Sequence, residues 1–356
     1  MQNELRPSTH RLAAWKWASI LILIYVFIAG WLVPLKPGII DVTPDRAVAG
    51  ETLTLKVKGY NTNYTAGAED LRAWLRLQGD TVLAANQVKV IDERYLEASF
   101  NIPSSMPFVR QAYPLTLILD QPGEGSSVLP NAIFITPSQN PDPGETSLWY
   151  SNKIGEIHEK KGFQYPFRNI LAETIRNTYF HVPMWFCMIA LFGVSAWHSL
   201  RYYRLGNPDD DQKSFAFIKV GLLFGVLGML TGMLWAKFTW NAYWSWDIKQ
   251  NMSAIALLIY AALMVLRSSV DDNMQKARLT AGYNMFAFVL LIPLLFIIPR
   301  MSDSLHPGNG GNPAMGGEDL DNTMRMVFYP ACIGWILLSL WISQLVYRTD
   351  KLNTTI

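Results

Sequence analysis

The chain has 356 residues, half of them hydrophobic and only 16% charged. Soluble globular proteins carry about 25% charged residues, so the composition argues against an ordinary soluble domain. Thirty Lys and Arg residues nearly cancel 28 Asp and Glu residues, which excludes a nucleic-acid-binding surface, and the hydrophobic fraction excludes intrinsic disorder. The two cysteines, Cys187 and Cys332, form no CxxC redox pair, and we expect both to pack in a core.

The apolar residues are concentrated in six runs, each close to the length that crosses a bilayer core of about 30 Å as a helix. These runs cover residues 15–34, 180–200, 215–235, 248–266, 283–299 and 326–347. Because backbone groups cannot stay unpaired in lipid, we predict a helix for each run. The first run is longer than a signal-peptide core and no A-x-A cleavage site follows it, so we predict that this helix is retained.

The placement of Lys and Arg predicts the orientation. These residues are frequent in the N-terminal tail, in the loops after the second and fourth runs, and in the C-terminal tail. All four segments lie on one side if the helices alternate, and the positive-inside rule makes that side cytoplasmic. We therefore expect both termini to lie in the cytoplasm. Segment 35–178, turn 236–247 and loop 300–325 would face the opposite side, although Lys237, Lys249, Arg300 and Arg325 lie in or beside the last two.

Residues 38–137 have a different pattern, with short alternating runs such as "ETLTLKVKGY" and "PLTLILD" separated by Gly, Pro, Asn and Asp. This pattern predicts a β-sandwich. The opening "IIDVTPDRAVAGETLTLKVKGYN" resembles an immunoglobulin-like domain of the IPT/TIG type. The segment contains no metal-ligand cluster and no catalytic set, so we interpret it as a docking or spacer domain.

A Pro-rich linker, "TPSQNPDPGETS", leads to a segment with helical spacing, "FRNILAETIRNTYF". We predict that this segment forms a helix at the membrane surface. The fold class is then an all-α polytopic membrane protein with six transmembrane helices and an inserted periplasmic β-sandwich. Its predicted parts are a tail with the first helix, the β-domain, a linker with the interfacial helix, and a five-helix membrane domain, at residues 1–37, 38–137, 138–178 and 179–350.

Four of the thirteen Trp residues fall within twelve residues, in "WAKFTWNAYWSWD" at the turn between the third and fourth helices. These are Trp235, Trp240, Trp244 and Trp246. Tryptophan anchors helices at membrane interfaces, so an aromatic belt is one interpretation. A cluster of indoles is also a good surface for a large planar ligand. The sequence by itself leaves both open. Asp247, which ends the motif, is suited either to cap the fourth helix or to accept an indole N–H.

Two histidines lie at the same outer face. His181 opens the second helix, and His306 follows the fifth. His198 lies about 25 Å further along the second helix, near the opposite face, and His10 and His158 are in polar flanks. A lone histidine at a helix end is usually a surface residue. Two of them on either side of a Trp-rich turn instead suggest axial ligands of a haem iron, with the indoles beneath the ring.

The same residues carry a family resemblance over about 200 residues. "WAKFTWNAYWSWD" resembles the WWD motif of the haem-handling membrane proteins of cytochrome c maturation, and "RNTYFHVP" resembles the segment before the first ligand histidine in haem exporter protein C. The resemblance implies that His181 and His306 are the axial ligands and that the four tryptophans with Asp247 form the platform. Arg176 and Lys249 would pair with haem propionates or hold a partner.

The resemblance also implies haem b as a non-covalent, transient cargo. It implies a bacterial inner membrane as well, with the β-domain and the haem site on the periplasmic side. The expected partners are a periplasmic haem chaperone (the E component), an ABC transporter of A and B components, and a small D-type subunit. The sequence departs from the family pattern in three respects. Ala236 and Asn241 replace glycines, which predicts a less tight turn; Lys249 stands where Arg is frequent; and the β-domain is additional.

Two histidines would saturate the iron, which favours a haem carrier over an enzyme, with no catalytic residues. The alternative is a subunit of a cytochrome c synthetase that attaches haem directly. Such proteins usually have further transmembrane histidines, and His198 is the only candidate here. A second, inner haem site at His198 remains the less favoured interpretation beside an interfacial residue. A cytochrome-b-like electron carrier would require pairs of histidines in the middle of the membrane, which the sequence lacks.

Overall fold

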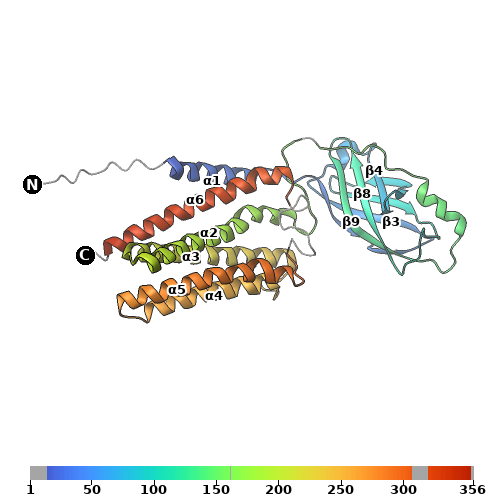
Figure 1. Ribbon diagram of the computed structural model, residues 1–356. Coiled ribbons are helices and arrows are strands. Elements are labelled where there is room, and N and C mark those ends of the chain that lie inside the picture. The colour runs from blue at the N-terminus through green and yellow to red at the C-terminus, as the bar shows by residue number, and fades with distance from the viewer. Residues whose placement is uncertain (1–13, 161, 307–319, 354–356) are drawn as a thin grey trace, which may run out of the picture. The chain divides into compact units, whose positions relative to one another are not determined.

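The computed structural model describes residues 14–160, 162–306 and 320–353 (Figure 1). The chain divides into two compact units. The helical unit consists of the chain up to Val33 and from Glu173 onward, and the β unit comprises Pro34–Ala172. The β unit is thus inserted between the first and second helices, and it includes the linker that follows the last strand.

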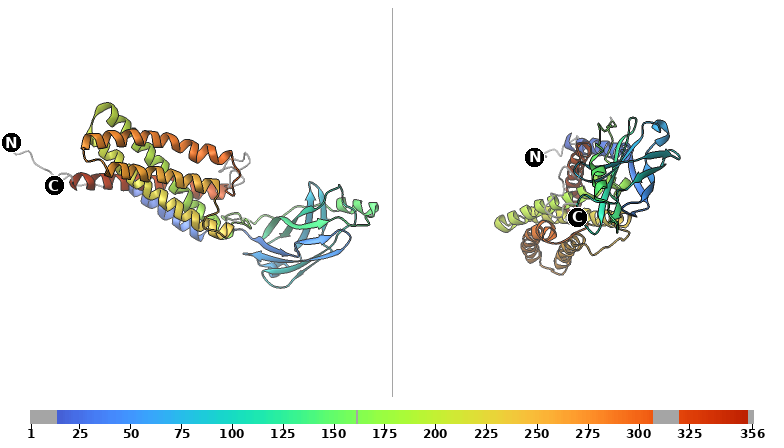
Figure 2. Two further views of the ribbon diagram at one scale, coloured as in Figure 1. Left: turned by 90° about the horizontal axis from the view of Figure 1, so that it is seen from below. Right: turned by 90° about the vertical axis from the view of Figure 1, so that its right-hand side faces the viewer.

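The helical unit contains six helices, each long and apolar enough to cross a membrane, within the described residues. Their bounds are α1 Ala14–Leu32, α2 Thr178–Leu205, α3 Pro208–Trp240, α4 Ile248–Ser268, α5 Asn273–Ile292 and α6 Asn322–Asn353. The predicted polytopic membrane fold is confirmed. The helices run roughly side by side in both views (Figure 1, Figure 2). Most of them extend beyond the apolar runs because polar turns continue the helix at one or both ends.

Local sequence explains how α2 connects to α3. Gly206 has a φ of +68°, the left-handed conformation that ends α2, and Asn207 then caps α3 by accepting from the Asp209 backbone N–H. Glycines along α3 let α2 approach closely, because a Cβ at Gly221 or Gly228 would contact side chains of α2. This tight pairing holds the first turn of α2 against the last turns of α3.

The β unit contains two sheets. Their strands are β1 Gly38–Thr43, β2 Arg46–Val48, β3 Thr52–Tyr60, β4 Arg72–Gln78, β5 Thr81–Ala84, β6 Gln87–Val90, β7 Tyr95–Asn101, β8 Tyr113–Gln121 and β9 Gly125–Thr136. One sheet has the order β1-β3-β7-β6 and the other β2-β9-β8-β4-β5. Alternate side chains of both sheets, such as Leu55 and Leu117, belong to one buried core. The predicted β-strands are therefore present as two sheets that share a core, while the immunoglobulin-like classification remains a prediction.

A buried carboxylate fixes the end of the linker within the β unit. Asp120 is fully buried; it forms an ion pair with Arg72 and accepts hydrogen bonds from the backbone N–H and the ring of His158. Burial alone would raise the pKa of Asp120, but these hydrogen bonds outweigh it and the pKa lies below its usual value. His158, assigned to a polar flank from the sequence, thus has a structural partner.

The predicted interfacial helix is wrong in its first part. Residues 167–171 form turns and extended chain, Ala172–Asn177 forms a 3₁₀ turn labelled η3, and the segment then continues into α2. Ala172 has a φ of +43°, which breaks any helix that would continue through it. Phe167 stacks on Tyr60 at a ring-centroid distance of 5.0 Å. Phe167 therefore packs within the β unit rather than along a helical stripe, and Ile170 is exposed.

Candidate functional site

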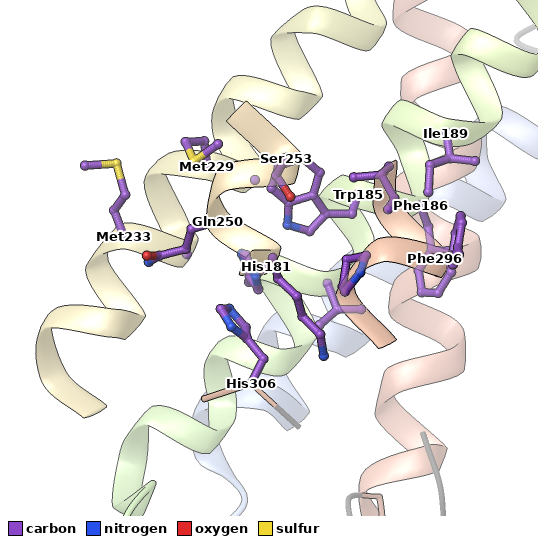
Figure 3. A pocket seen from close by; sticks show the side chains of 16 residues that line it. His181, Trp185, Phe186, Ile189, Met229, Met233, Gln250, Ser253, Phe296 and His306 are labelled. Carbon is purple, nitrogen blue, oxygen red and sulfur yellow. The ribbon is translucent and has the colours of Figure 1, made fainter. Parts of the chain in front are cut away.

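The helical unit has a cavity of about 230 Å³ that both predicted histidines line. His181 lies in the first turn of α2, and His306 lies in the loop that follows α5. Figure 3 shows both rings at this cavity. The structure therefore brings together two residues that are 125 positions apart in the sequence. The same-face placement expected from the alternating topology holds for the helical unit.

Asp247 anchors His306. The Nδ1 atom of His306 lies 2.8 Å from Asp247 Oδ1, and the same carboxylate accepts from the backbone N–H of Leu305 at 2.7 Å and from the Ser304 hydroxyl at 3.1 Å. An ionised carboxylate only accepts hydrogen bonds, so Nδ1 carries the proton and Nε2 keeps its lone pair. Burial opposes the charge, but the hydrogen bonds from His306 and Leu305 lower the pKa of Asp247 well below its usual range.

Asp247 also caps α4 by accepting from the backbone N–H of Lys249 at 2.9 Å. The capping role expected for this residue is confirmed. Its contact with His306 was not foreseen from the sequence, because the two residues are 59 positions apart and no local spacing links them. Together, the two contacts join the start of α4 to the loop that carries the histidine.

Thr231 orients His181 in a similar way. The Thr231 hydroxyl donates to the carbonyls of Leu227 and Gly228 in its own helix, and its oxygen lies 3.1 Å from His181 Nδ1. Because that hydroxyl proton is already used, His181 Nδ1 is the donor and Nε2 keeps its lone pair. Gly232 makes room for the ring, since a Cβ there would lie 2.7 Å from His181 Cε1.

The four tryptophans divide into two pairs. Trp235 lies 6.5 Å from the His181 ring and 5.8 Å from the His306 ring, and Trp240 meets His306 edge-on at 4.7 Å, all between ring centroids. These two indoles pack directly against the histidines. Trp244 and Trp246 contact each other at 6.3 Å on the turn, and Trp246 is 79% exposed. None of the four is among the residues that line the cavity.

The backbone at Asn241 has a conformation that glycine adopts readily. Asn241 ends α3 with a φ of +60°, which asparagine tolerates better than most residues. Lys237 donates to both the carbonyl and the side chain of Asn241. Trp246 also has a positive φ, +58°, and Asn251 donates to its carbonyl. Such strain persists only where neighbouring contacts over-determine the backbone.

The two predicted cations lie in different surroundings. Lys249 lines the cavity. Arg176 is buried instead; its guanidinium donates to the carbonyls of Gly30 and Val33 at the end of α1 and pairs with Glu173. These contacts tie α1 to the start of α2. Arg176 does not line the cavity.

The remaining cavity wall is apolar and partly irregular. After α5 the chain makes one π-helical turn, η4 Pro293–Ile297, and one 3₁₀ turn, η5 Ile298–Arg300. Phe296 and Pro299 from these turns line the cavity, together with Trp185 and Met229. Proline cannot donate to the helix ladder, so Pro293 explains the departure from α-helix. These irregular turns therefore form part of the cavity wall.

The donor set distinguishes haem from a bare metal ion. Among the described residues no group of three or more His, Cys, Asp or Glu side chains is placed to hold a metal ion. A zinc site needs three or four such ligands, whereas a haem iron brings four nitrogens of its own and needs only axial ligands. Two imidazoles with bare Nε2 atoms beside apolar and aromatic walls therefore fit a haem.

His198 lies away from this cavity. Its Nδ1 atom is 2.7 Å from Asp210 Oδ1, and its ring stacks on Phe217 at 6.0 Å. Both cysteines lie in the helical unit, with Cys187 fully buried in a cluster with Met184 and Leu191. His10, the remaining histidine, lies outside the described residues.

The six apolar helices define a multi-pass membrane protein, and the two-histidine cavity lies at one end of its bundle. The sequence profile of the family described as Heme exporter protein C matches residues 164–355, more than half of the chain. The chain therefore belongs to the haem exporter protein C family. The match covers α2 to α6 and leaves out most of the β unit.

Individual relatives agree with this assignment. The chain is 27% identical over 180 residues to Heme exporter protein C of Bradyrhizobium diazoefficiens, which covers 51% of this chain and 68% of the relative. It is 22% identical over 182 residues to Heme exporter protein C of Haemophilus influenzae, covering 51% and 73%. Cytochrome c biogenesis protein CcsA of Pelargonium hortorum is 30% identical over 117 residues, which is 33% of this chain and 36% of that protein.

Proposed function

We propose that the protein binds haem through His181 and His306 and hands it on for cytochrome c biogenesis. The observation that carries the proposal is that both imidazoles line one cavity with Nδ1 held by a hydrogen bond. Anchoring one ring nitrogen orients the other toward a ligand and raises its basicity. The names of the relatives, haem exporter protein C and cytochrome c biogenesis protein, support haem as the cargo.

In this proposal the protein binds and carries haem and does not catalyse a reaction on it. The haem, of the non-covalently bound b type, supplies an iron whose two axial positions the imidazoles would fill. A six-coordinate iron has no open position for oxygen, so the cargo stays inert until a ligand is exchanged. The two proposed ligands differ in their surroundings: His306 is carried by a loop, and His181 is carried by helix α2. Release would then begin at His306, the ligand on the loop.

Roles for the other residues follow from their positions. Trp235 and Trp240 would hold the two imidazoles by ring contacts, while Trp244 and Trp246 are placed on the turn for the outer edge of the haem or for a partner. Lys249, at the cavity, is the proposed partner of a propionate. Arg176 is better suited to joining α1 and α2.

We place the haem site on the periplasmic side of a bacterial inner membrane, with both termini in the cytoplasm. The proposed recipient is a periplasmic haem chaperone, the E component, and the proposed neighbours are an ABC transporter of A and B components and a small D-type subunit. The likeness to CcsA supports a second candidate, a haem-handling subunit of a cytochrome c synthetase.

The test loads the purified full-length protein with haemin. We expect His181→Ala and His306→Ala each to lower bound haem by about 10- to 100-fold in affinity, whereas His198→Ala and His158→Ala serve as matched controls and retain it. Equal retention in all four variants would contradict the ligand assignment. Incubation with apocytochrome c alone then separates the candidates, because only a synthetase would produce covalent haem without the chaperone.

A further inference from the structure

A second and larger cavity, of about 1120 Å³, lies at the opposite end of the helical unit. Phe215, near the start of α3, lines it, while Met229, further along the same helix, lines the histidine cavity. Fourteen residues of helix between them correspond to about 21 Å. The other walls come from the end of α2, the α4–α5 turn and the end of α6. This cavity has no part in the proposed haem site.

Two of its four basic side chains are already paired. Arg267 makes a bidentate ion pair with Asp211, at 2.8 and 2.7 Å, and Lys219 pairs with Asp350. Both cations also lie over the Phe215 ring, at 4.3 and 5.1 Å from its centroid. These pairs brace α3 against α4 and α6, and they leave no net charge.

The other two basic side chains give the cavity an excess of positive charge. Lys276 and Arg278, on the first turns of α5, have no ion-pair partner among the described residues. Asp272, which precedes them, uses its carboxylate to cap α5 by accepting from the Gln275 backbone N–H. An anion that enters this cavity would therefore meet two cations without displacing an existing pair.

The walls beside these cations are apolar. Phe215, Met264 and Met274 line the cavity, and Met274 is 68% exposed. A small soluble anion gains no binding free energy from apolar walls. An amphiphile buries its chains against them while its charged group contacts Lys276 and Arg278. Basic pockets between membrane helices bind phospholipid headgroups for this reason.

We propose that this cavity binds an anionic phospholipid, with its phosphate at Lys276 and Arg278 and its acyl chains against Phe215 and Met264. A soluble phosphate ester shares the headgroup chemistry, and the apolar walls favour the lipid. The lipid would fill the space between the α4–α5 pair and α6 and so stabilise the bundle at the end remote from the haem site.

The experiment uses detergent-purified, delipidated full-length protein. Thermal unfolding is followed with phosphatidylglycerol, phosphatidylcholine or glycerol 3-phosphate added. We expect phosphatidylglycerol to raise Tm in a concentration-dependent manner and the other two compounds to leave it unchanged. Lys276→Gln with Arg278→Gln should weaken phosphatidylglycerol binding about 25-fold, since each surface cation contributes about fivefold. Both residues are at least partly exposed, so the variant should fold.

The matched control is Arg204→Gln with Arg348→Gln, two exposed cations of the helical unit that do not line the cavity. The control should bind phosphatidylglycerol as the wild type does. Equal stabilisation by phosphatidylcholine, an equal loss in the control, or an equal shift with glycerol 3-phosphate would each overturn the assignment. Haem absorbance should be unchanged in both double variants, which separates this proposal from the haem site.

Discussion

The carboxylate of Asp247 accepts hydrogen bonds from Lys249, Ser304, Leu305 and His306, and so it links a helix start to a histidine-bearing loop. We expect Asp247→Ala to lower haem affinity about 10- to 100-fold, the usual effect of removing a residue that orients a ligand. It should also cost about 1 kcal/mol through the lost helix cap.

Asp247→Asn separates the two effects, because an amide oxygen still caps the helix but offers the His306 Nδ1–H a weaker, uncharged acceptor. Its haem affinity should lie between those of the wild type and the Ala variant. The control is Asp303→Ala, an exposed acid of the same loop. Haem titration followed by absorbance is the measurement. Wild-type affinity in Asp247→Ala would refute the anchoring role.

Gly232 provides the space that the His181 ring occupies, and substituting it tests whether the position of that ring matters for haem binding. A Cβ at this position would lie 2.7 Å from the His181 ring, so Gly232→Ala must displace the imidazole. Stability should not fall, because alanine in a helix interior is favoured over glycine by about 0.5–1 kcal/mol. We expect a severalfold loss of haem affinity with unchanged or higher Tm. Gly282→Ala, where the added Cβ meets open space, is the control and should keep haem affinity.

At the scale of elements, the α3–α4 turn depends on Asn241 in the left-handed conformation. Asn241→Gly should be tolerated, whereas Asn241→Val should destabilise the protein by about 1–3 kcal/mol, because a β-branched residue is poorly accommodated there. Since Trp240 precedes this residue and contacts His306, the Val variant should also bind haem more weakly. Equal Tm values for the two variants would show that the turn does not require this conformation.

The elements differ in how far the sequence could predict them. Length and hydrophobicity suffice for α1 to α6, because the bilayer imposes both. The segment around Phe167 was misjudged, since its helical spacing is overridden by stacking on Tyr60. In the site, the motif and the topology pointed to His181 and His306. Their anchors, Thr231 and Asp247, depend on contacts between distant parts of the chain that no spacing rule contains.

At the scale of the whole molecule, the β unit has its own core. Its buried Asp120, which pairs with Arg72, holds the linker at His158 by contacts that depend on pH. Because the pKa of Asp120 is lowered in the folded state, its contribution is present above the ordinary aspartate pKa and is lost as pH falls through the folded-state value. Asp120→Asn should therefore speed hydrogen exchange of β-unit peptides at pH 7, with the difference from wild type shrinking in acid. A difference that persists unchanged at low pH would contradict this.

The β unit and the proposed haem site belong to separate units, and the family match leaves most of the β unit out. Deleting residues 38–137 should therefore leave haem binding by the helical unit intact. The measurement is haem content per purified protein. Complete haem loss in a deletion variant that is still inserted and monodisperse would show that the β unit contributes to the site.

The most direct test of the central claim is the spin state of the bound iron. Electron paramagnetic resonance of the haem-loaded full-length protein should give a low-spin ferric signal typical of two imidazoles. His181→Gly and His306→Gly should each convert it to high spin, and added imidazole should restore the low-spin signal because it occupies the vacated position. A high-spin wild type, or a low-spin signal that survives either substitution without imidazole, would contradict ligation by these two residues.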